Sequence, residues 1–474
     1  MRGKLVSIKL QRARYVALDW GTSTLGFFIF NIFRYFLLSI SAEGLSLSQY
    51  LCSGILLIEQ IGVPLVMLGI FWISGYYNNP FGKSRLEELS TTLISTGVST
   101  VGIYLTLLIN DQLYGRTISY ELLTMLMLCL FTPVYIGRLS LTQHAIRNFH
   151  TLRWGFNTVM IGDSDKSMQT ADRLRKTQSR LGYDIMSFVP IEGEKSSNRP
   201  HSTISHAQLE TLCRNRQVDQ ILIVTEKSDD TSLLHLIFSY IPLNVPIRLA
   251  PNELQLLSST LRTRDVYAEP FVDVTAPSVS DFTKNLKRVI DVTLSAAAML
   301  LIWPVMAVAA IAVKRSSPGP VFYSQERIGY RQQPFKIYKF RTMVQNAESD
   351  GPRLSDDNDP RITRAGHIMR KYRIDELPQL WNVLKGDMSL VGPRPEREFF
   401  IRQIVEKAPY YTLIHQVRPG LTSWGMVKFG YAKNVSEMVE RTRYDIMYIS
   451  NMSILMDFKI MIHTVKTVFS GKGV

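Results

Sequence analysis

The sequence is poor in cysteine and has no two cysteines at a short spacing. Its 474 residues include three, Cys52, Cys129 and Cys213, which are far apart and form no CxxC motif. This spacing supports neither a disulfide framework nor a structural metal site, so we expect a reducing environment. A cleavable signal peptide is also missing, because the first apolar run, residues 15–40, is too long and has no small-residue cleavage site.

Acidic residues are outnumbered by basic ones. Lys and Arg total 54 and Asp and Glu total 40, which gives a net charge of +14. Such an excess favours anionic partners, namely acidic lipid headgroups, nucleotides or nucleic acid. A nucleic-acid site would combine basic residues with stacking aromatics on an exposed face. Here the basic residues lie next to apolar segments that are candidates for membrane insertion, so no nucleic-acid partner is expected.

Four apolar runs in the first third of the chain are long enough, or nearly so, to cross a bilayer core of roughly 30 Å. They cover residues 15–40, 51–72, 89–109 and 120–136. Basic residues cluster before the first run, between the second and third, and after the fourth. By the positive-inside rule, both ends of this α-helical N-terminal bundle, residues 1–140, face the cytoplasm.

Three charged residues lie inside the first two runs. Asp19 and Arg34 are in the first run and Glu59 is in the second. Charge within a membrane is a functional hypothesis, and a transporter would use it. We favour interhelical polar pairs, or side chains that reach the membrane interface.

Residues 150–270 alternate short apolar runs with helical segments, which predicts a Rossmann-like α/β middle domain with a parallel sheet. A nucleotide-binding loop would have three glycines in the pattern GxGxxG, but only Gly162 is present, and Asp163 and Asp165 follow it. Because an acidic turn repels a pyrophosphate, we expect a regulatory or structural domain.

A fifth apolar segment, residues 289–313, has basic residues on both flanks, which does not suit a crossing of the membrane. Pro304 bends the chain near its middle. We therefore expect a re-entrant helix-break-helix, residues 286–315, that dips into the membrane and returns. It would hold an α/β-mixed monotopic catalytic domain, residues 284–474, at the cytoplasmic face. The alternative is a plain fifth span with the remaining residues outside.

Two adjacent carboxylates, Asp375 and Glu376, lie in the stretch of residues 370–395 with basic residues on both sides. Pro378 is tolerated only in a first turn, so we expect a helix from about Asp375 that ends at Gly386. The helix N-terminus would favour the carboxylates and accept a phosphate. The simpler interpretation is an Asp that only caps a helix. The apolar stripe of the expected helix is Leu377, Leu380, Trp381 and Leu384.

Three arginines around this stretch lie beside a proline or at the end of a strand-like segment. Arg341 ends the alternating segment FKIYKFRTM, Arg394 follows Pro393, and Arg418 lies in VRPGLTSWG. Together with Arg370 they place cations around a carboxylate pair, as expected for recognition of a diphosphate.

From Lys287 to its end, the chain resembles the monotopic phosphoglycosyl transferase superfamily, bacterial enzymes that start polyprenol-linked glycan assembly. The motifs that carry the resemblance, in the family's order, are KxxxD, FKIYKFRTM, NDPRITRAG, RIDELPQLWNVLKGDMSLVGPRP and VRPGLTSW. With its apolar runs and middle domain, the chain is similar to the large bacterial subgroup, the undecaprenyl-phosphate sugar-1-phosphate transferases.

The resemblance implies an enzyme of the bacterial inner membrane that transfers a sugar-1-phosphate from a UDP-sugar to undecaprenyl phosphate in surface polysaccharide synthesis. Asp375 would attack the β-phosphorus and expel UMP, giving an aspartyl-linked sugar phosphate. Glu376 would hold Mg²⁺. The catalytic domain would contact membrane lipid, and a homodimer is the assembly expected. The substrate-binding residues implied are Arg341, Arg370, Pro393, Arg394 and Arg418.

The sequence departs from the family pattern at three places outside the carboxylate pair, one of which is the middle domain without the glycines of a nucleotide fold. Trp303-Pro304 replaces a common Ser-Pro, and Ser423 and Met426 stand where Gly and Gln are usual. Two other functions are compatible with a membrane protein of this kind. A membrane nucleotide-sugar dehydratase needs a complete glycine loop and a Tyr-x-x-x-Lys pair, which the chain lacks. A non-enzymatic membrane scaffold would use Asp375 only as a helix cap.

Overall fold

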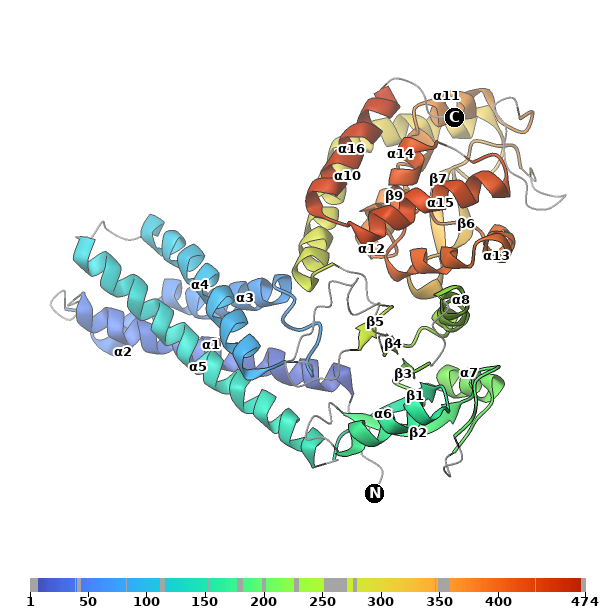
Figure 1. Cartoon of the computed structure of the whole chain (residues 1–474). Helices are drawn as coiled ribbons and strands as arrows, with labels where there is room; N and C mark the ends of the chain where they lie inside the picture. The colour runs from blue at the N-terminus through green and yellow to red at the C-terminus, as the bar shows by residue number, and fades with distance from the viewer. Residues whose placement is uncertain are drawn as a thin grey trace. The chain divides into compact units, whose positions relative to one another are not determined.

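The computed structural model (Figure 1) describes residues 7–38, 40, 44–81, 83–110, 116–151, 153–176, 182–197, 202–225, 230–250, 271–275, 279–345, 347, 359–430 and 432–469. The end of the expected middle domain, residues 251–270, lies outside the described residues, as does the end of its first expected helix, residues 177–181. The chain forms two compact units. One is built around Met1–Thr158, with Gln169–Met186, and the other around Phe271–Val474, with Val159–Met168 and Ser187–Ser259.

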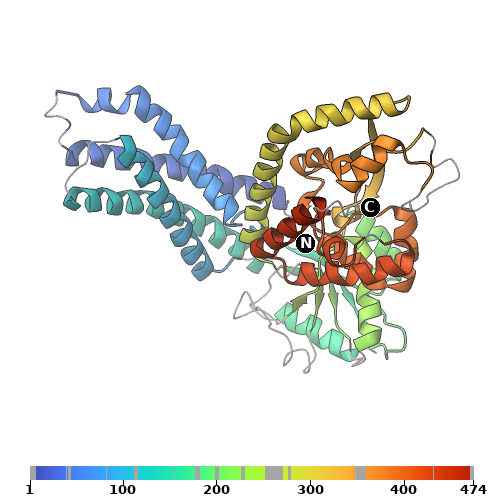
Figure 2. The same ribbon diagram turned by 90° about the horizontal axis from the view of Figure 1, so that it is seen from above.

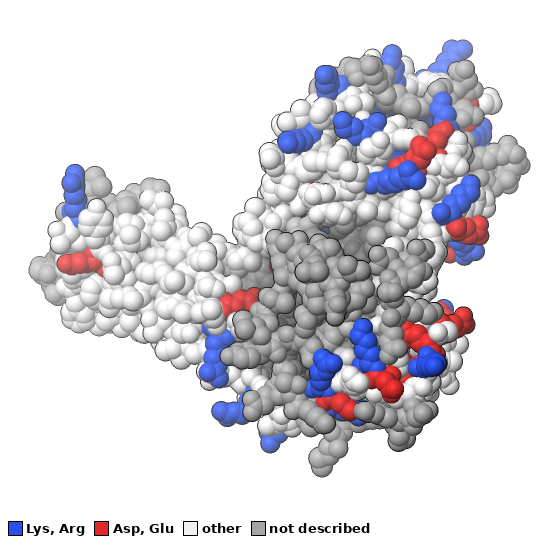
Figure 3. Space-filling view, in the orientation of Figure 1, with Lys and Arg blue, Asp and Glu red and all other residues white. Residues whose placement is uncertain are grey.

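The N-terminal unit consists mainly of helices that match the expected apolar runs. They are α1 (Ile8–Leu37), α2 (Leu47–Leu51), α3 (Gly54–Ile73), α4 (Arg85–Asn110) and α5 (Arg116–His150). Their visible surface carries few charged side chains (Figure 3). The mostly helical, apolar character fits a membrane protein.

Four helices in the described part of the chain are long and apolar enough to cross a membrane, namely α1, α3, α5 and α10 (Asp281–Ser316). The third expected span is helical as α4 but is not among them. Most of its buried residues are hydroxylated or acidic, whereas Ile103 is a buried apolar one. Their hydroxyls donate back to the helix, as Ser95 does to the carbonyl of Thr91 at 2.6 Å and Ser99 to that of Ser95 at 2.8 Å. The buried polar residues of α4 are Glu88, Thr92, Ser95, Thr96, Ser99 and Thr100.

Asp19 in α1 is one half of an interhelical polar pair. Arg138 in α5 donates to both of its carboxylate oxygens at 2.8 Å, and both side chains are fully buried. Tyr77 donates to the same carboxylate at 2.7 Å, and Arg138 also donates to Thr92. The expectation of a polar pair is confirmed for Asp19, because a buried charge needs such a partner.

The middle region has the expected α/β character. Its five strands lie in the order β2-β1-β3-β4-β5. The parallel pairing expected from the sequence holds for β3 and β4, whereas β5 pairs with β4 in the antiparallel direction. An antiparallel edge strand on a parallel sheet is common. The strands and helices are β1 (Phe156–Ile161), α6 (Asp165–Lys176), β2 (Tyr183–Val189), α7 (His206–Arg214), β3 (Gln220–Ile223), α8 (Asp230–Tyr240), η2 (Ile241–Leu243), β4 (Ile247–Leu249) and β5 (Val272–Asp273).

Gly162 has a structural role at the turn between β1 and α6. Its φ is +111°, and a Cβ there would lie 2.0 Å from the carbonyl oxygen of Val224. The backbone N–H of Ser197 donates to the carbonyl of Asp163 at 2.8 Å. The glycine therefore permits a close approach of two chain segments of the protein itself.

Helix α10 is continuous over 36 residues. It bends near its middle (Figure 2), and it contains Pro304, which lacks an N–H for the carbonyl one turn earlier. Apolar side chains in this part are strongly exposed, with Leu300 at 76% and Leu301 at 79%. The expected break is thus a bend inside one helix instead of a loop between two.

The remaining elements form a mixed α/β assembly. Strands β6 and β7 pair as an antiparallel hairpin, and β8 pairs with β9 in parallel. The elements are β6 (Phe322–Ile328), η3 (Tyr330–Gln332), β7 (Pro334–Phe340), α11 (Arg364–Lys371), η4 (Ile374–Glu376), α12 (Gln379–Lys385), β8 (Ser389–Val391), α13 (Glu398–Lys407), η5 (Pro409–Gln416), β9 (Gly420–Thr422), α14 (Trp424–Lys428), α15 (Val435–Ser450) and α16 (Ile454–Phe469).

The KxxxD motif ties α10 to this assembly. Lys287 donates to Asp457 of α16 at 2.7 Å and lies 3.7 Å from Asp291. Asp291 accepts from the Ser389 hydroxyl at 2.7 Å and from the backbone N–H of Leu390 at 3.3 Å. One buried lysine therefore neutralises two carboxylates and holds α10 to α16, while Asp291 holds α10 to β8.

We expect Lys287→Met to lower the free energy of unfolding by about 3–5 kcal/mol, because it leaves two buried carboxylates without their cation. Thermal unfolding of the full chain in detergent would show a lower midpoint. Lys314→Met is the matched control, since Lys314 lies on the same helix and is exposed. Equal midpoints for the two variants would contradict this role.

Candidate active site

The expected helix after the carboxylate pair begins later than the sequence predicts. Asp375 and Glu376 lie in the short 3₁₀ helix η4, and α12 starts at Gln379 with Pro378 as its N-cap. The backbone N–H of Leu377 therefore donates to the carbonyl of Ile374, three residues earlier. Asp375 is the N-cap of neither helix, so the simple capping interpretation does not describe it.

The far end of α12 matches the expectation. Gly386 has a φ of 100° and its N–H donates to the carbonyls of Asn382 and Val383. Only a residue without a Cβ adopts this conformation easily. The expected apolar stripe is partly wrong, because Trp381 is 54% exposed while Val383 is fully buried.

Glu376 is surrounded by three cations. Lys339, at the end of β7, donates to its Oε1 at 2.8 Å. Arg394 lies 3.5 Å from Oε1, and Arg373 lies 3.6 Å from Oε2. Because Glu376 is only 5% exposed, these contacts are weakly screened. The cations come from the β7 strand, the turn before η4 and the VGPRP loop.

Asp375 is also buried, at 8% exposure. Burial and then the negative charge of Glu376 raise the pKa of Asp375 to about 6, although Lys339, Arg370 and Arg394 act in the opposite direction. Burial also opposes ionisation of Glu376, but Lys339, Arg394 and Arg373 outweigh it and hold the pKa of Glu376 below its usual range. Adjacent carboxylates with separated pKa values suit different chemical roles.

A second buried carboxylate, Glu396, fixes Arg394 from behind. Glu396 accepts from Arg441 at 2.6 Å and from Arg327 at 3.1 Å, and Arg394 Nε lies 4.0 Å from it. Burial opposes ionisation, but Arg441, Arg327 and Arg394 together lower the pKa of Glu396. Arg394 therefore lies between two carboxylates, which limits its movement.

The structure brings some of the expected cations to the carboxylate pair and leaves others elsewhere. Arg394 contacts Glu376. Arg370 donates a hydrogen bond to the Thr342 hydroxyl at 3.0 Å, and its positive charge lowers the pKa of Asp375. Arg341 instead donates to the carbonyls of residues 317 and 318, at the end of α10.

Arg418 and Pro393 are also away from direct contact with the pair. Arg418 donates to the carbonyl of Gly386, beyond the far end of α12. The carbonyl of Pro393 accepts from the N–H of Gly420, which links the VGPRP loop to β9. Their part in substrate binding stays a prediction.

Two cations at the site were missed from the sequence. Lys339 lies two residues before Arg341, so the period of a strand places both on the same face, and this signal was present. Arg373 had no such signal. It has a φ of 55°, an unusual conformation for a residue with a side chain, and only the tertiary structure selects it.

Asp375 and Glu376 could together contribute ligands to a divalent cation. Within the described residues, no group of three or more His, Cys, Asp or Glu side chains could hold a metal ion by itself. Asp375 and Glu376 remain as an adjacent carboxylate pair. Such a pair fits Mg²⁺, which binds proteins through one or two carboxylates and completes its shell with substrate phosphates and water.

Comparison with known proteins gives a consistent picture. A sequence model described as "Bacterial sugar transferase" matches residues 282–471. The chain is 44% identical over 188 residues to the UDP-N-acetylgalactosamine-undecaprenyl-phosphate N-acetylgalactosaminephosphotransferase of Aeromonas hydrophila. The matched residues make up 40% of this chain and 44% of that protein. It is 42% identical over 188 residues to the UDP-glucose:undecaprenyl-phosphate glucose-1-phosphate transferase of Caulobacter vibrioides, covering 39% of this chain and 70% of that protein.

A longer match includes part of the middle region. The UDP-glucose:undecaprenyl-phosphate glucose-1-phosphate transferase of Escherichia coli K12 is 33% identical over 326 residues, which is 67% of this chain and 69% of that protein. The chain thus spans less than half of the Aeromonas relative and about two thirds of the Escherichia coli one. On the strength of the longer match, the chain belongs to the bacterial sugar transferase family.

Proposed function

We propose that this chain transfers a sugar-1-phosphate from a UDP-sugar to undecaprenyl phosphate, giving undecaprenyl-diphospho-sugar and UMP. The observation that carries the proposal is the buried pair of Asp375 and Glu376 among cations from three separate segments. A carboxylate with a raised pKa next to one that stays ionised can divide the roles of nucleophile and metal ligand. The names of the relatives support the substrate class.

The reaction has two displacements at one phosphorus. In the first, an Asp375 carboxylate oxygen attacks the β-phosphorus of the UDP-sugar, and the bond to the α-phosphate oxygen breaks, so UMP leaves. In the second, a phosphate oxygen of undecaprenyl phosphate attacks the same phosphorus and releases Asp375 as a carboxylate. A covalent intermediate converts one difficult transfer into two easier ones.

The cations stabilise negative charge that spreads over the phosphoryl oxygens. Arg394 is held between Glu376 and Glu396, so it can face the phosphate without a large rearrangement. Lys339 and Arg373 keep Glu376 ionised. Arg370 acts on Asp375, and Arg341 remains a proposed substrate contact farther out.

Glu376 is the proposed ligand of Mg²⁺. When bound, Mg²⁺ neutralises charge on the diphosphate and helps UMP to leave. Glu376 fits this role because its pKa is held low, so it is a carboxylate at any working pH.

We propose three domains: a four-helix membrane domain, residues 1–140, a Rossmann-like domain, residues 150–270, and the catalytic domain, residues 284–474. Basic residues on both flanks of α10 and its bend near Pro304 support re-entry from the cytoplasmic side of the inner membrane. The lipid acceptor would then reach Asp375 along α10. A homodimer is proposed on the resemblance alone.

Replacing Asp375 with Asn should lower UMP release by at least about a thousandfold, because the amide cannot act as the nucleophile. UMP would be measured with UDP-sugars, undecaprenyl phosphate and Mg²⁺. Asp387→Asn is the matched control, since Asp387 follows the other end of α12. Without the lipid acceptor, the unaltered chain should also gain the mass of one sugar phosphate on Asp375. UMP release by D375N at the control's rate would rule out this mechanism.

UMP release should fall about tenfold for each pH unit below about 6 and level off above it. The sign follows from the chemistry, because only ionised Asp375 attacks and its raised pKa keeps it protonated in acid. Single-turnover release between about pH 5 and 8 would show this limb. Circular dichroism at each pH would verify that the chain stays folded. A flat profile would exclude Asp375 as the titrating nucleophile.

Lys339→Gln should move this acid limb to higher pH, because the positive charge of Lys339 lowers the pKa of Asp375. The matched control is Lys336→Gln, which removes an exposed lysine from the same strand. A purely structural role of Lys339 would reduce the rate equally at all pH values, and an unmoved limb would therefore contradict the prediction.

A further inference from the structure

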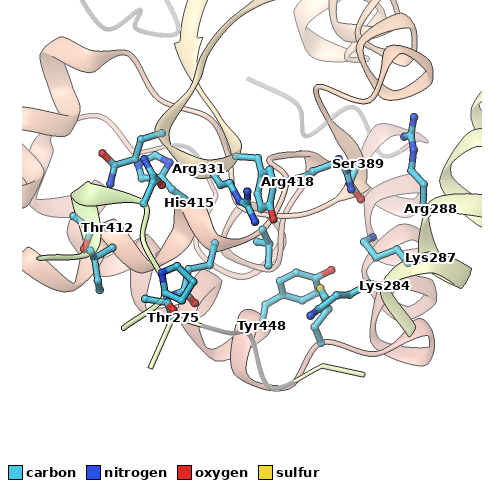
Figure 4. Close-up of a pocket in the computed structure, with 18 of the residues that line it drawn as sticks. Thr275, Lys284, Lys287, Arg288, Arg331, Ser389, Thr412, His415, Arg418 and Tyr448 are labelled. Atoms are coloured by element: carbon cyan, nitrogen blue, oxygen red, sulfur yellow. The ribbon is translucent and has the colours of Figure 1, made fainter. Parts of the chain in front are cut away.

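A second cavity lies apart from the carboxylate pair. It has a volume of about 350 Å³ and is lined by the start of α10, the η3 turn, η5, and residues from 241–246 and 273–275 (Figure 4). Arg288 and Arg418, which line it, donate to the carbonyls of Val383, Leu384 and Gly386. These carbonyls mark the C-terminal end of α12, whereas Asp375 and Glu376 precede its start, roughly 10 Å away along the helix.

The cavity has an excess of positive charge. Its lining includes five lysines and arginines but two aspartates, Asp273 and Asp291. The carboxylate of Asp291 already forms an ion pair with Lys287 and accepts hydrogen bonds from Ser389 and the backbone N–H of Leu390. Within the described residues, Arg288, Arg331 and Arg418 form no ion pair with a carboxylate. The basic residues are Lys284, Lys287, Arg288, Arg331 and Arg418.

Two of these arginines share one aromatic ring. The guanidinium carbon of Arg331 lies 5.2 Å from the centre of the Tyr330 ring, and that of Arg418 lies 5.7 Å from it. Like charges gathered without a carboxylate between them are stabilised by an external anion.

Arg331 is held in place by an unusual turn. Arg331 and Gln332 have φ values of 55° and 57°, and the turn is closed by hydrogen bonds from Gln332 to Gly329 and from Gln333 to Tyr330. Positive φ at two successive residues is the geometry of tight hairpin turns, where Gly and Asn are usual, and here it places Arg331 at the tip of the β6–β7 hairpin. Figure 4 shows Arg331 and His415 on one side of the cavity and Lys284 and Lys287 on the other, with Arg418 between them.

The rest of the lining suits an organic ring with hydroxyl groups. Val245, Pro246 and Val417 supply apolar surface, while Asn244 and Thr412 supply polar groups. The volume lies within the ~300–1,000 Å³ of typical small-molecule sites.

We propose that this cavity binds a nucleoside phosphate, with the phosphate between Arg331 and Arg418 and the ring against the apolar wall, at a site separate from the carboxylate pair. A lipid headgroup offers the same phosphate chemistry. The nucleoside is favoured because Ile241, Val245 and Pro246 give the cavity an apolar wall, which a headgroup alone would leave uncovered.

Equilibrium dialysis of the full chain in detergent micelles would test this, with radiolabelled UMP and, separately, AMP as probes. EDTA in the buffer removes the divalent cation on which the proposed donor site depends. The unaltered chain should bind at least one of the two nucleotides saturably. Arg331→Gln should weaken that binding at least about tenfold, which is the loss of one charge-assisted contact.

Arg331→Lys should give an intermediate affinity, because it keeps the charge but loses the planar donor pair. The control is Lys336→Gln, which removes a charge from the same hairpin outside the cavity and should bind like the unaltered chain. Inorganic phosphate and glycerol 3-phosphate, the chemistry of a lipid headgroup, serve as competitors. The proposal is overturned if neither nucleotide binds, if R331Q binds as K336Q does, or if either competitor displaces the nucleotide as well as unlabelled nucleotide.

Discussion

The burial of two adjacent carboxylates is the constraint on which the catalytic region depends. A carboxylate removed from water needs positive charge or hydrogen-bond donors close by, and two neighbouring carboxylates need more of both. Glu376 receives them from Lys339, Arg373 and Arg394. Asp375 receives only their longer-range influence and that of Arg370, so its pKa rises while that of its neighbour falls. The same group of cations thus holds the pKa of Glu376 below its usual range, while the pKa of Asp375 stays raised.

The surrounding elements place those cations close to Glu376. The β6–β7 hairpin presents Lys339, and a left-handed residue before η4 turns Arg373 back toward Glu376. Arg394 is fixed by Glu396, which is itself held by Arg327 and Arg441. The chain therefore uses a second buried carboxylate to position a cation for the first. Removing one member of such a network leaves the others buried without compensation.

Buried charges in other parts of the molecule are also neutralised by ion pairs. In the N-terminal unit, Asp19 and Arg138 neutralise each other between α1 and α5, and in the second unit Lys287 joins Asp291 and Asp457. Both groups connect helices that are far apart in sequence. Around the cavity at the start of α10, by contrast, Arg288, Arg331 and Arg418 are brought together without a carboxylate partner among the described residues. This difference marks the cavity as a site for an outside anion.

The sequence by itself determined the features that depend on local pattern. The apolar runs predicted α1, α3, α5 and α10, the alternation in FKIYKFRTM predicted β7, and Gly386 predicted the end of α12, because each follows from spacing within a few residues. Only the tertiary structure decided that α12 begins at Gln379, that Arg341 bonds to carbonyls at the end of α10, and that Lys339 and Arg373 neutralise Glu376. These contacts join segments whose proximity is set by burial and charge compensation across the whole unit, and no local spacing records it.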